Sequence, residues 1–217
     1  PGMNDLAEHL AEDLKIKRNT CVSSIDPADG KWQITDTTGE DVGTFDWVIL
    51  NCPPKQCLTI LNGQSVLSEQ IADVEMDPCW AMMLTTEDLG DIDFDGAFVA
   101  NGPLSWIAHD GSKPRRHETD AVTNWTLHAS AKWSEDHLEC CPSQIKSELL
   151  LAFEDAVKKK VRPLHCKVHR WRYALPKVAL EEQCLWDPVA GLGACGDWCF
   201  SPKIEGAFLS GMAMAGT

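Results

Sequence analysis

The sequence predicts an α/β fold with an inserted α+β domain, and three stretches carry that prediction. The run FDWVILNC is continuously apolar and stops at Pro53 and Pro54, as expected for a strand buried on both faces in a parallel sheet. Residues 76–185 hold several short strand-like runs and one helix, which favours an antiparallel sheet. The stretch AGLGACGDW then returns to a buried strand. We therefore expect one α/β domain from residues 1–75 and 186–217, interrupted by the α+β domain.

The chain begins with a predicted amphipathic helix in PGMNDLAEHLAEDL, which Asn4 or Asp5 is placed to cap. One face of this helix should carry Leu6, His9, Leu10 and Leu14. The chain opens with Pro1, inside a packed element, so we expect it to be cut from a longer protein. A cloning or processing artefact of a few residues is the alternative.

Strand and turn signals follow the first helix. KIKRNTCVSSID reads as a strand, and Trp32 and Ile34 alternate with polar neighbours between turn signals at 29–30 and 38–39, which predicts a hairpin. After the run at 45–52, KQCLTIL and SVLSEQIADV predict two short helices around a loop at Asn62-Gly63. These elements belong to the predicted α/β domain.

The predicted inserted domain is a series of short strands with one helix. The strand-like runs are MDPCWAMMLTT, GAFVAN, SWIAHD, NWTLHAS and KVHRWRYAL. The helix, PSQIKSELLLAFEDAVKKK, has Pro142 near its start and lysines at its end, which suits the helix dipole.

Composition restricts the class of partner. The chain has 217 residues, 44% of them hydrophobic, and a formal net charge of -14. A surface this acidic repels phosphate backbones and anionic lipid, so we expect neither nucleic acid nor membrane as partner. No apolar run reaches the roughly 18 residues of a membrane span. The expected partner is a small-molecule substrate.

The ten cysteines do not follow a metal-binding pattern. Cys52 and Cys57 are five positions apart, Cys195 and Cys199 are four apart, and no C-x-x-C occurs. We therefore predict no metal site. Several cysteines lie in apolar runs, where a reduced thiol behaves as a small hydrophobe. Buried free thiols predict the cytoplasm or another reducing compartment.

A dinucleotide-binding fingerprint, G-x-G-x-x-G, spans Gly191 to Gly196. A Rossmann unit needs a helix directly after these glycines and an acidic residue on a second strand about 20 positions later. Here Asp197-Trp198 follows, and the remaining 21 residues hold no such strand. We therefore reject a Rossmann unit at this position.

The same stretch fits a different ligand-binding pattern. A strand ends at Gly196-Asp197, a loop follows, and a helix begins near Ile204. Gly196 permits close backbone approach to a ligand, and Asp197 is able to accept a hydrogen bond from a sugar-alcohol hydroxyl. The helix N-terminus is suited to phosphate oxygens, and Gly206, Gly211 and Ala207 are small enough to let the helix pack closely. For Asp197 and Glu205, capping of the helix is the purely structural alternative.

GDWCFSPKIEGAFLSGMAMA resembles the C-terminal flavin motif of the renalase-like, amine-oxidase-type FAD oxidoreductases. PGMNDLAEHLAEDL resembles the family's PGM-plus-helix segment, and FDWVILNCPPKQCLTIL resembles its "vivatP" strand. NTCVSSI resembles a strand whose valine contacts adenine. DPCWAMML, PLSWIAHDGSKP, WTLHASAKWS and HRWRYALP resemble segments of its substrate domain, so the similarity covers essentially the whole chain.

The resemblance implies FAD as cofactor and the C-terminal part of a two-domain FAD oxidoreductase fold. Residues 1–75 and 186–217 would form a partial FAD-binding domain, and residues 76–185 a substrate-binding domain. The activity implied is hydride transfer from an isomeric reduced nicotinamide dinucleotide or an amine, with reoxidation by O₂ to H₂O₂. Because the flavin carries this chemistry, no catalytic side chain is assigned. The implied cofactor-binding residues are Val22, Gly196, Asp197, Glu205, Gly206 and Ala207.

Aromatic and basic residues of the inserted domain are candidates for a substrate pocket. Arg170 and Arg172 should share one face of a strand, where they either bind an anionic substrate or are solvated. Aromatic residues at alternate positions are also common in cores. A His109–Asp110 proton relay and an ordinary surface pair are both open. The pocket candidates are Trp106, His109, Arg170, Trp171, Arg172 and Tyr173.

The chain departs from the family in lacking the N-terminal βαβ unit with its G-x-G-x-x-G and acidic ribose ligand. The chain is then a fragment, or half of a split protein completed in trans, or a degenerate relative that has lost FAD and serves as a scaffold. Without that unit the parallel sheet would have open apolar edges. We therefore expect self-association of the isolated chain or a partner that supplies the missing segment.

Overall fold

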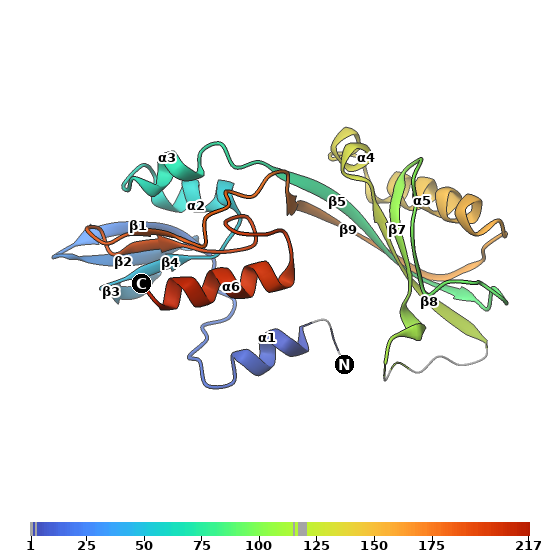
Figure 1. Cartoon of the computed structure of the whole chain (residues 1–217), viewed down its shortest axis with the longest axis horizontal. Coiled ribbons are helices and arrows are strands. Elements are labelled where there is room, and N and C mark those ends of the chain that lie inside the picture. The colour runs from blue at the N-terminus through green and yellow to red at the C-terminus, as the bar shows by residue number, and fades with distance from the viewer. Residues whose placement is uncertain (1, 3, 115, 117–120) are drawn as a thin grey trace. The chain divides into compact units, whose positions relative to one another are not determined.

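The computed structural model describes residues 2, 4–114, 116 and 121–217, which divide into two compact units (Figure 1). One, here the inserted unit, comprises Pro1–Asp13 and Asp77–Ala174. The other, the flanking unit, comprises Leu14–Met76 and Leu175–Thr217. The boundaries differ from the expected ones, because residues 1–13 group with the inserted unit and the chain returns at Leu175.

An antiparallel three-stranded sheet opens the flanking unit: β1 (Val22–Ala28), β2 (Lys31–Asp36) and β3 (Asp41–Phe45). Asp29 and Gly30 both have positive φ, 49° and 77°, as a tight two-residue hairpin turn requires. Ile25 and Trp32 point into the core from β1 and β2. The predicted hairpin is confirmed.

A second sheet of the flanking unit contains the predicted parallel pair. Its order is β10 (Leu185–Asp187), β11 (Leu192–Ala194), β4 (Val48–Leu50), and β11 is parallel to β4 and antiparallel to β10. The expectation that β4 is buried on both faces is wrong. Val48 and Leu50 are buried, but Ile49 is 50% exposed. β4 is an edge strand, so only one of its faces is fully covered in the described chain.

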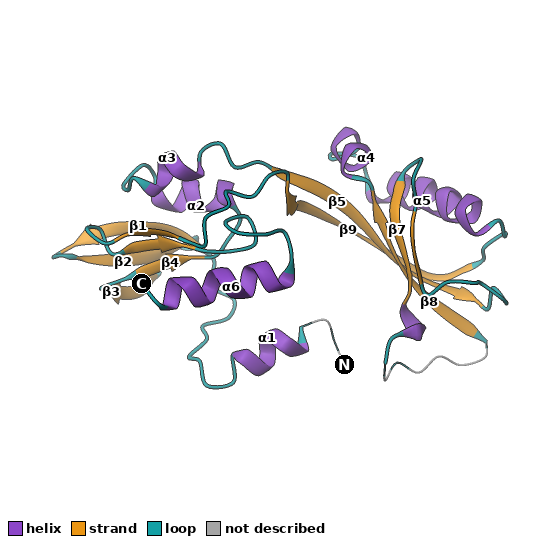
Figure 2. Cartoon of the chain, viewed as in Figure 1, coloured by secondary structure: helices purple, strands orange, loops and turns teal. Residues whose placement is uncertain are grey.

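Helices complete the flanking unit (Figure 2). α2 (Pro54–Leu61) begins directly after β4 and ends at Asn62, whose φ of 46° is left-handed, which confirms the predicted loop. α2 and α3 (Leu67–Ile71) pack against the core that β4 and β11 share. α6 (Ile204–Ala215) lies across the other face of that sheet, since a Cβ on Gly193 would come 2.8 Å from Met214.

The inserted unit is a five-stranded sheet in the order β6-β7-β8-β5-β9. The β6–β7, β7–β8 and β8–β5 pairs are antiparallel, which confirms the predicted sheet type. The strands are β5 (Met76–Glu87), β6 (Gly96–Phe98), β7 (Leu104–His109), β8 (Val122–Ala129) and β9 (Pro163–Pro176).

The predicted long helix, α5 (Pro142–Val157), covers one face of this sheet. Ile145, Leu149, Phe153 and Val157 form a stripe at every fourth position and are buried against Trp125 and Leu127 of β8. A short helix, α4 (Ala131–Asp136), and a 3₁₀ turn, η1 (Asp110–Ser112), follow strands β8 and β7.

The N-terminal helix is shorter than predicted. α1 spans Asp5–Leu10, no side chain caps its N-terminus, and none of its residues is buried. The apolar face of the predicted helix is therefore exposed at Leu6, Leu10 and Leu14. A helix of six residues with no buried face has little to stabilise a further turn.

Candidate cofactor and substrate sites

The loop after β11 is fixed at Gly196. Cys195 donates its N–H to the Leu50 carbonyl at 3.0 Å, which extends the parallel pairing by one residue. Gly196 has a φ of 153°, and a Cβ there would lie 3.0 Å from the indole Nε1 of Trp198. Its own N–H donates to the Ser210 hydroxyl of α6 at 3.0 Å. Glycine is therefore required here by the packing of the chain itself.

Asp197 follows and is half-buried. Burial raises the pKa of its carboxyl, and the N–H groups of Trp198 and of Asp197 itself lower it in part. Among the described residues, no side chain forms a hydrogen bond or ion pair with this carboxylate. Asp197 is therefore a partly desolvated acceptor with capacity for a ligand hydroxyl.

The first turn of α6 supplies backbone donors. Lys203 is the N-cap residue, and the first intrahelical bond runs from the Ala207 N–H to its carbonyl at 3.0 Å. The N–H groups of Ile204, Glu205 and Gly206 thus have no acceptor within the helix. Such groups bind anionic oxygens, so Glu205 and Gly206 offer donors at this terminus and Ala207 does not.

Gly206 has a second, structural reason to be glycine. A Cβ at Gly206 would lie 2.1 Å from the carbonyl oxygen of Ser201, a backbone atom that has no room to move away. The helix therefore starts against the loop that carries Asp197. Gly211, expected from the sequence to allow close packing, faces open space, so that expectation is wrong.

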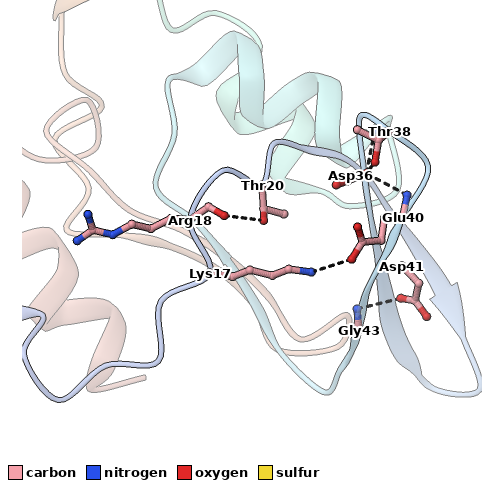
Figure 3. Close-up of polar contacts among 8 residues, drawn as sticks. All are labelled: Lys17, Arg18, Thr20, Asp36, Thr38, Glu40, Asp41 and Gly43. Carbon is pink, nitrogen blue, oxygen red and sulfur yellow. Dashed lines mark hydrogen bonds and ion pairs between the residues drawn. The ribbon is translucent and has the colours of Figure 1, made fainter.

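Val22 is the first residue of β1 and is half-buried. Its neighbour Ser23 donates its hydroxyl to the carbonyls of Thr35 and Asp36, at 3.0 and 2.9 Å. Thr38 and Glu40 bond to the Asp36 carboxylate, and the Thr38 hydroxyl is the main cause of its lowered pKa (Figure 3). These bonds hold the start of β1 against the turn after β2.

Strand β1 is also held through the segment before it. Lys17 reaches the Glu40 carboxylate at 3.4 Å, and the Thr20 hydroxyl donates to the Arg18 carbonyl at 3.2 Å. Figure 3 draws both contacts. All six predicted cofactor-binding residues, Val22 included, lie in the flanking unit. Their contact with FAD stays a prediction.

A cavity of about 490 Å³ lies on the face of the inserted sheet that α5 does not cover. In β8, Asn124, Thr126 and His128 line it, while the alternate Leu127 is buried against α5. Its volume is in the range of ligand pockets. The other lining residues are Met83, Leu84, Thr85, Trp106, Ala108, Asp110, Lys113, Arg116, Trp125 and His165.

The charges of this cavity are mostly cationic. Lys113 donates to the Asp110 carboxylate at 2.6 Å, and Arg116 pairs with its other oxygen. Burial, and secondarily Lys113, lowers the pKa of His128. The described charged lining is therefore Asp110, Lys113 and Arg116, and its two cationic side chains are of the kind that bind anionic groups.

Of the six predicted pocket residues, Trp106 alone lines this cavity in the described chain. The His109 ring stacks on Trp125, with ring centroids 4.7 Å apart, while Asp110 is held by Lys113 and Arg116. The other residues that line the cavity were not among the candidates predicted from the sequence. The signal that identifies them is the polar alternation in NWTLHAS, which marks a strand face open to a ligand.

The predicted residues of β9 lie on two faces, as expected. Arg170 and Arg172 both pair with Glu139, and Arg170 also lies over the Trp80 ring at 5.5 Å. These contacts give the arginines a structural role between β9 and the segment before α5. Trp171 is exposed on the opposite face, and Tyr173 beside it is half-buried.

In the described part of the chain, no cluster of three or more His, Cys, Asp or Glu side chains is arranged to hold a metal ion. Across those same residues, no helix combines the length and the apolar character that crossing a bilayer takes.

A family model, flavin containing amine oxidoreductase, matches residues 1–216. The chain therefore belongs to the flavin-containing amine oxidoreductases, and the cofactor of that family is a flavin. The fold agrees with this membership.

Individual relatives support the same family. The chain is 23% identical to the renalase of Mus musculus over 170 residues, which are 74% of this chain and 49% of the renalase. A candidate protoporphyrinogen oxidase of Exiguobacterium sp. 255-15 superposes with a TM-score of 0.78 at 17% identity, over 98% of this chain and 50% of that one. An oxidoreductase of Methanosarcina mazei gives 0.62 at 16%, over 90% and 48%. The chain thus spans about half the length of these relatives.

Proposed function

We propose that this chain provides the cofactor loop and the substrate-binding sheet of an FAD-dependent oxidase. The observation that carries this proposal is the loop at Gly196–Asp197 followed by the free N-terminus of α6. It combines a carboxylate acceptor with backbone donors, and FAD offers hydroxyls and phosphates of matching chemistry. The residues present therefore fit a flavin dinucleotide.

Each group has a defined task in that proposal. Gly196 leaves the backbone accessible, Asp197 accepts a hydrogen bond from a ribityl hydroxyl, and the N–H groups of Glu205 and Gly206 hold phosphate oxygens. When bound, FAD supplies the hydride acceptor, and O₂ takes up the two electrons and two protons as H₂O₂. The protein binds, orients and shields the reactants.

The cavity of the inserted unit favours a reduced nicotinamide dinucleotide over an amine as substrate. Lys113 and Arg116 attract phosphate, and the Trp106 indole offers a surface on which a nicotinamide ring can stack. An alkylammonium ion would need a carboxylate, but Asp110 is already held by both cations. We infer that isomeric forms of reduced nicotinamide dinucleotides are the substrates.

The open edge of β4 bears on how the cofactor site is completed. β4 pairs with β11 on one side only, while Trp47 and Ile49 expose apolar surface beside it. On α6, Ile204, Phe208 and Met212 are exposed as well. We propose that a βαβ segment, on the same or another polypeptide, adds a parallel strand at β4 and holds the FAD pyrophosphate.

The same edge supports the competing function, a scaffold that has lost FAD and uses this surface for association. The proposed compartment is the cytoplasm or another reducing one, supported by ten free cysteines, of which Cys57, Cys195 and Cys199 are buried.

The test is the visible absorption spectrum of the purified protein, followed by anaerobic mixing with isomeric reduced nicotinamides and with benzylamine. We expect a flavin spectrum that is bleached by the nicotinamides, and H₂O₂ on readmission of air. A flavin protein bleached only by benzylamine would overturn the substrate. A colourless protein, also after incubation with FAD, would overturn the oxidase and favour the scaffold.

A further inference from the structure

Two cysteines lie in contact beneath the cofactor loop. The Sγ atoms of Cys52 and Cys57 are 3.4 Å apart. Cys52 follows β4, Pro53 is the N-cap of α2, and Cys57 lies on the first turn of that helix. Two consecutive prolines restrict the connecting backbone, so the approach of the sulfurs is built into the turn between strand and helix.

The two cysteines of this pair differ in how deeply they are buried. Cys57 is fully buried, whereas Cys52 is half-buried. The Cys57 thiol also lies 3.2 Å from the Cys52 carbonyl oxygen. No metal-binding cluster includes these residues in the part of the chain that the structure describes, so metal ligation does not explain the contact.

We propose that Cys52 and Cys57 are a redox-active dithiol that a peroxide converts into an intramolecular disulfide. In the first step the Cys52 thiolate attacks a peroxide oxygen, the O–O bond breaks, and the products with H₂O₂ are a sulfenic acid and water. In the second step Cys57 attacks the Cys52 sulfur, the S–O bond breaks and a second water leaves. Two thiols lose two electrons and two protons, which reduce one peroxide to two waters.

The hydrogen bonding favours this division of roles. The contact with the Cys57 thiol lowers the pKa of Cys52, in spite of burial. That same interaction and burial raise the pKa of Cys57. Cys52 also precedes the N-terminus of α2, where the helix dipole favours a thiolate. Cys52 therefore attacks first, and Cys57 stays protonated until a sulfenic acid has formed beside it.

The pair is connected to the cofactor loop through Trp198. The Trp198 indole Nε1 donates to the Cys52 carbonyl at 3.2 Å, and the same indole limits the space at Gly196. Cys199, one residue further, is fully buried near Cys57. A disulfide would remove the Cys57 thiol hydrogen from this network, so the loop at Gly196–Asp197 would sense the oxidation state.

The experiment is peptide mapping of the full protein as purified, before and after treatment with H₂O₂ and alkylation of the remaining thiols. Trypsin cleaves at Lys55, between the two cysteines, and gives one peptide of residues 32–55 and another that begins at Gln56. We expect peroxide to join these two peptides into one species, lighter than their sum by two hydrogens, and dithiothreitol to separate them.

Fragment ions distinguish Cys57 from Cys79, which lies in the same tryptic peptide. Cys52→Ser should abolish the linked species, whereas Cys141→Ser should retain it, although Cys141 is exposed and a hydrogen bond from Ser143 lowers its pKa. Linkage of peptide 32–55 to the peptide that holds Cys195 and Cys199 would overturn the proposal. So would oxidation of Cys141 while Cys52 stays reduced. The reaction uses added peroxide, so its outcome is independent of the proposed oxidase activity.

Discussion

At the scale of single residues, contacts with Trp198 and Ser210 fix the conformation of the cofactor loop at Gly196. Trp198 occupies the space where Gly196 would carry a side chain, and Ser210 satisfies the Gly196 N–H. In the described chain, no side chain forms a hydrogen bond or ion pair with the Asp197 carboxylate. Its role is therefore open to substitution experiments that leave the packing unchanged.

Asp197→Ala should weaken FAD binding in the full protein by about 10- to 150-fold, because a hydrogen bond to a charged group contributes roughly 1.5–3 kcal/mol. Asp197→Asn retains an acceptor oxygen and should lose less. The measurement is flavin absorbance per mole of protein after dialysis. Equal flavin content in the unmodified protein and both variants would show that the Asp197 side chain does not contribute to FAD binding.

Asp187 predicts a pH dependence of stability. Its carboxylate accepts bonds from the N–H groups of Ala190 and Val189 at 3.0 and 3.1 Å, and from Ser65 at 2.9 Å. The Ala190 N–H is the main cause of its lowered pKa. A lowered pKa in the folded state stabilises the protein above the unfolded value of about 3.9, and this contribution is lost as pH falls through the folded pKa.

Asp187→Asn should therefore lower the melting temperature at pH 7, and the difference from the unmodified protein should shrink on acidification toward pH 3. Thermal melts across that range measure it. Asp13→Asn, which removes the charge of an exposed carboxyl, is the control. A difference that stays constant with pH would contradict the assigned charge interaction.

At the scale of elements, two glycines of α6 differ in the space around them: Gly206 lies against the backbone of Ser201, and Gly211 faces open space. Gly206→Ala introduces a Cβ 2.1 Å from the Ser201 carbonyl oxygen, so we expect a loss of about 1–3 kcal/mol in the free energy of unfolding. Gly211→Ala is the matched control in the same helix. Its Cβ meets nothing within 4 Å, and helix propensity should add about 0.5–1 kcal/mol. Urea unfolding of both variants measures these changes; equal effects would show that Gly206 is not constrained by Ser201.

Elements with local signals could be predicted from the sequence. The hairpin at Asp29-Gly30 and the α5 stripe depend on neighbouring residues alone, and both are present. The exposed face of β4 could not be predicted from its apolar sequence, because the burial of a strand depends on which strands lie beside it. The cavity needed tertiary structure too, since His165 and Lys113 are distant in sequence.

At the scale of the whole molecule, the open β4 edge predicts association. Residues 1–217 expressed alone should self-associate, because β4 and the outer face of α6 expose apolar surface. Ile49→Asp should shift the protein toward monomer, measured by light scattering after size-exclusion chromatography. Leu151→Asp, on α5 at 63% exposure, is the control and should change nothing. Unchanged association of the Ile49 variant would show that the β4 edge does not drive self-association.

The division of the flanking unit has a consequence for how the protein is made. β4 at Val48–Leu50 finds its partner strand at Leu192–Ala194, after the whole of the inserted sheet has been synthesised. At a translation rate of about 5–20 residues per second, the nascent β4 waits on the order of ten seconds for β11. The inserted sheet, complete once β9 has emerged, is able to fold first. During that interval the apolar side chains of β4 and α2 lack the cover that β11 provides, and the cofactor loop, which follows β11, cannot form.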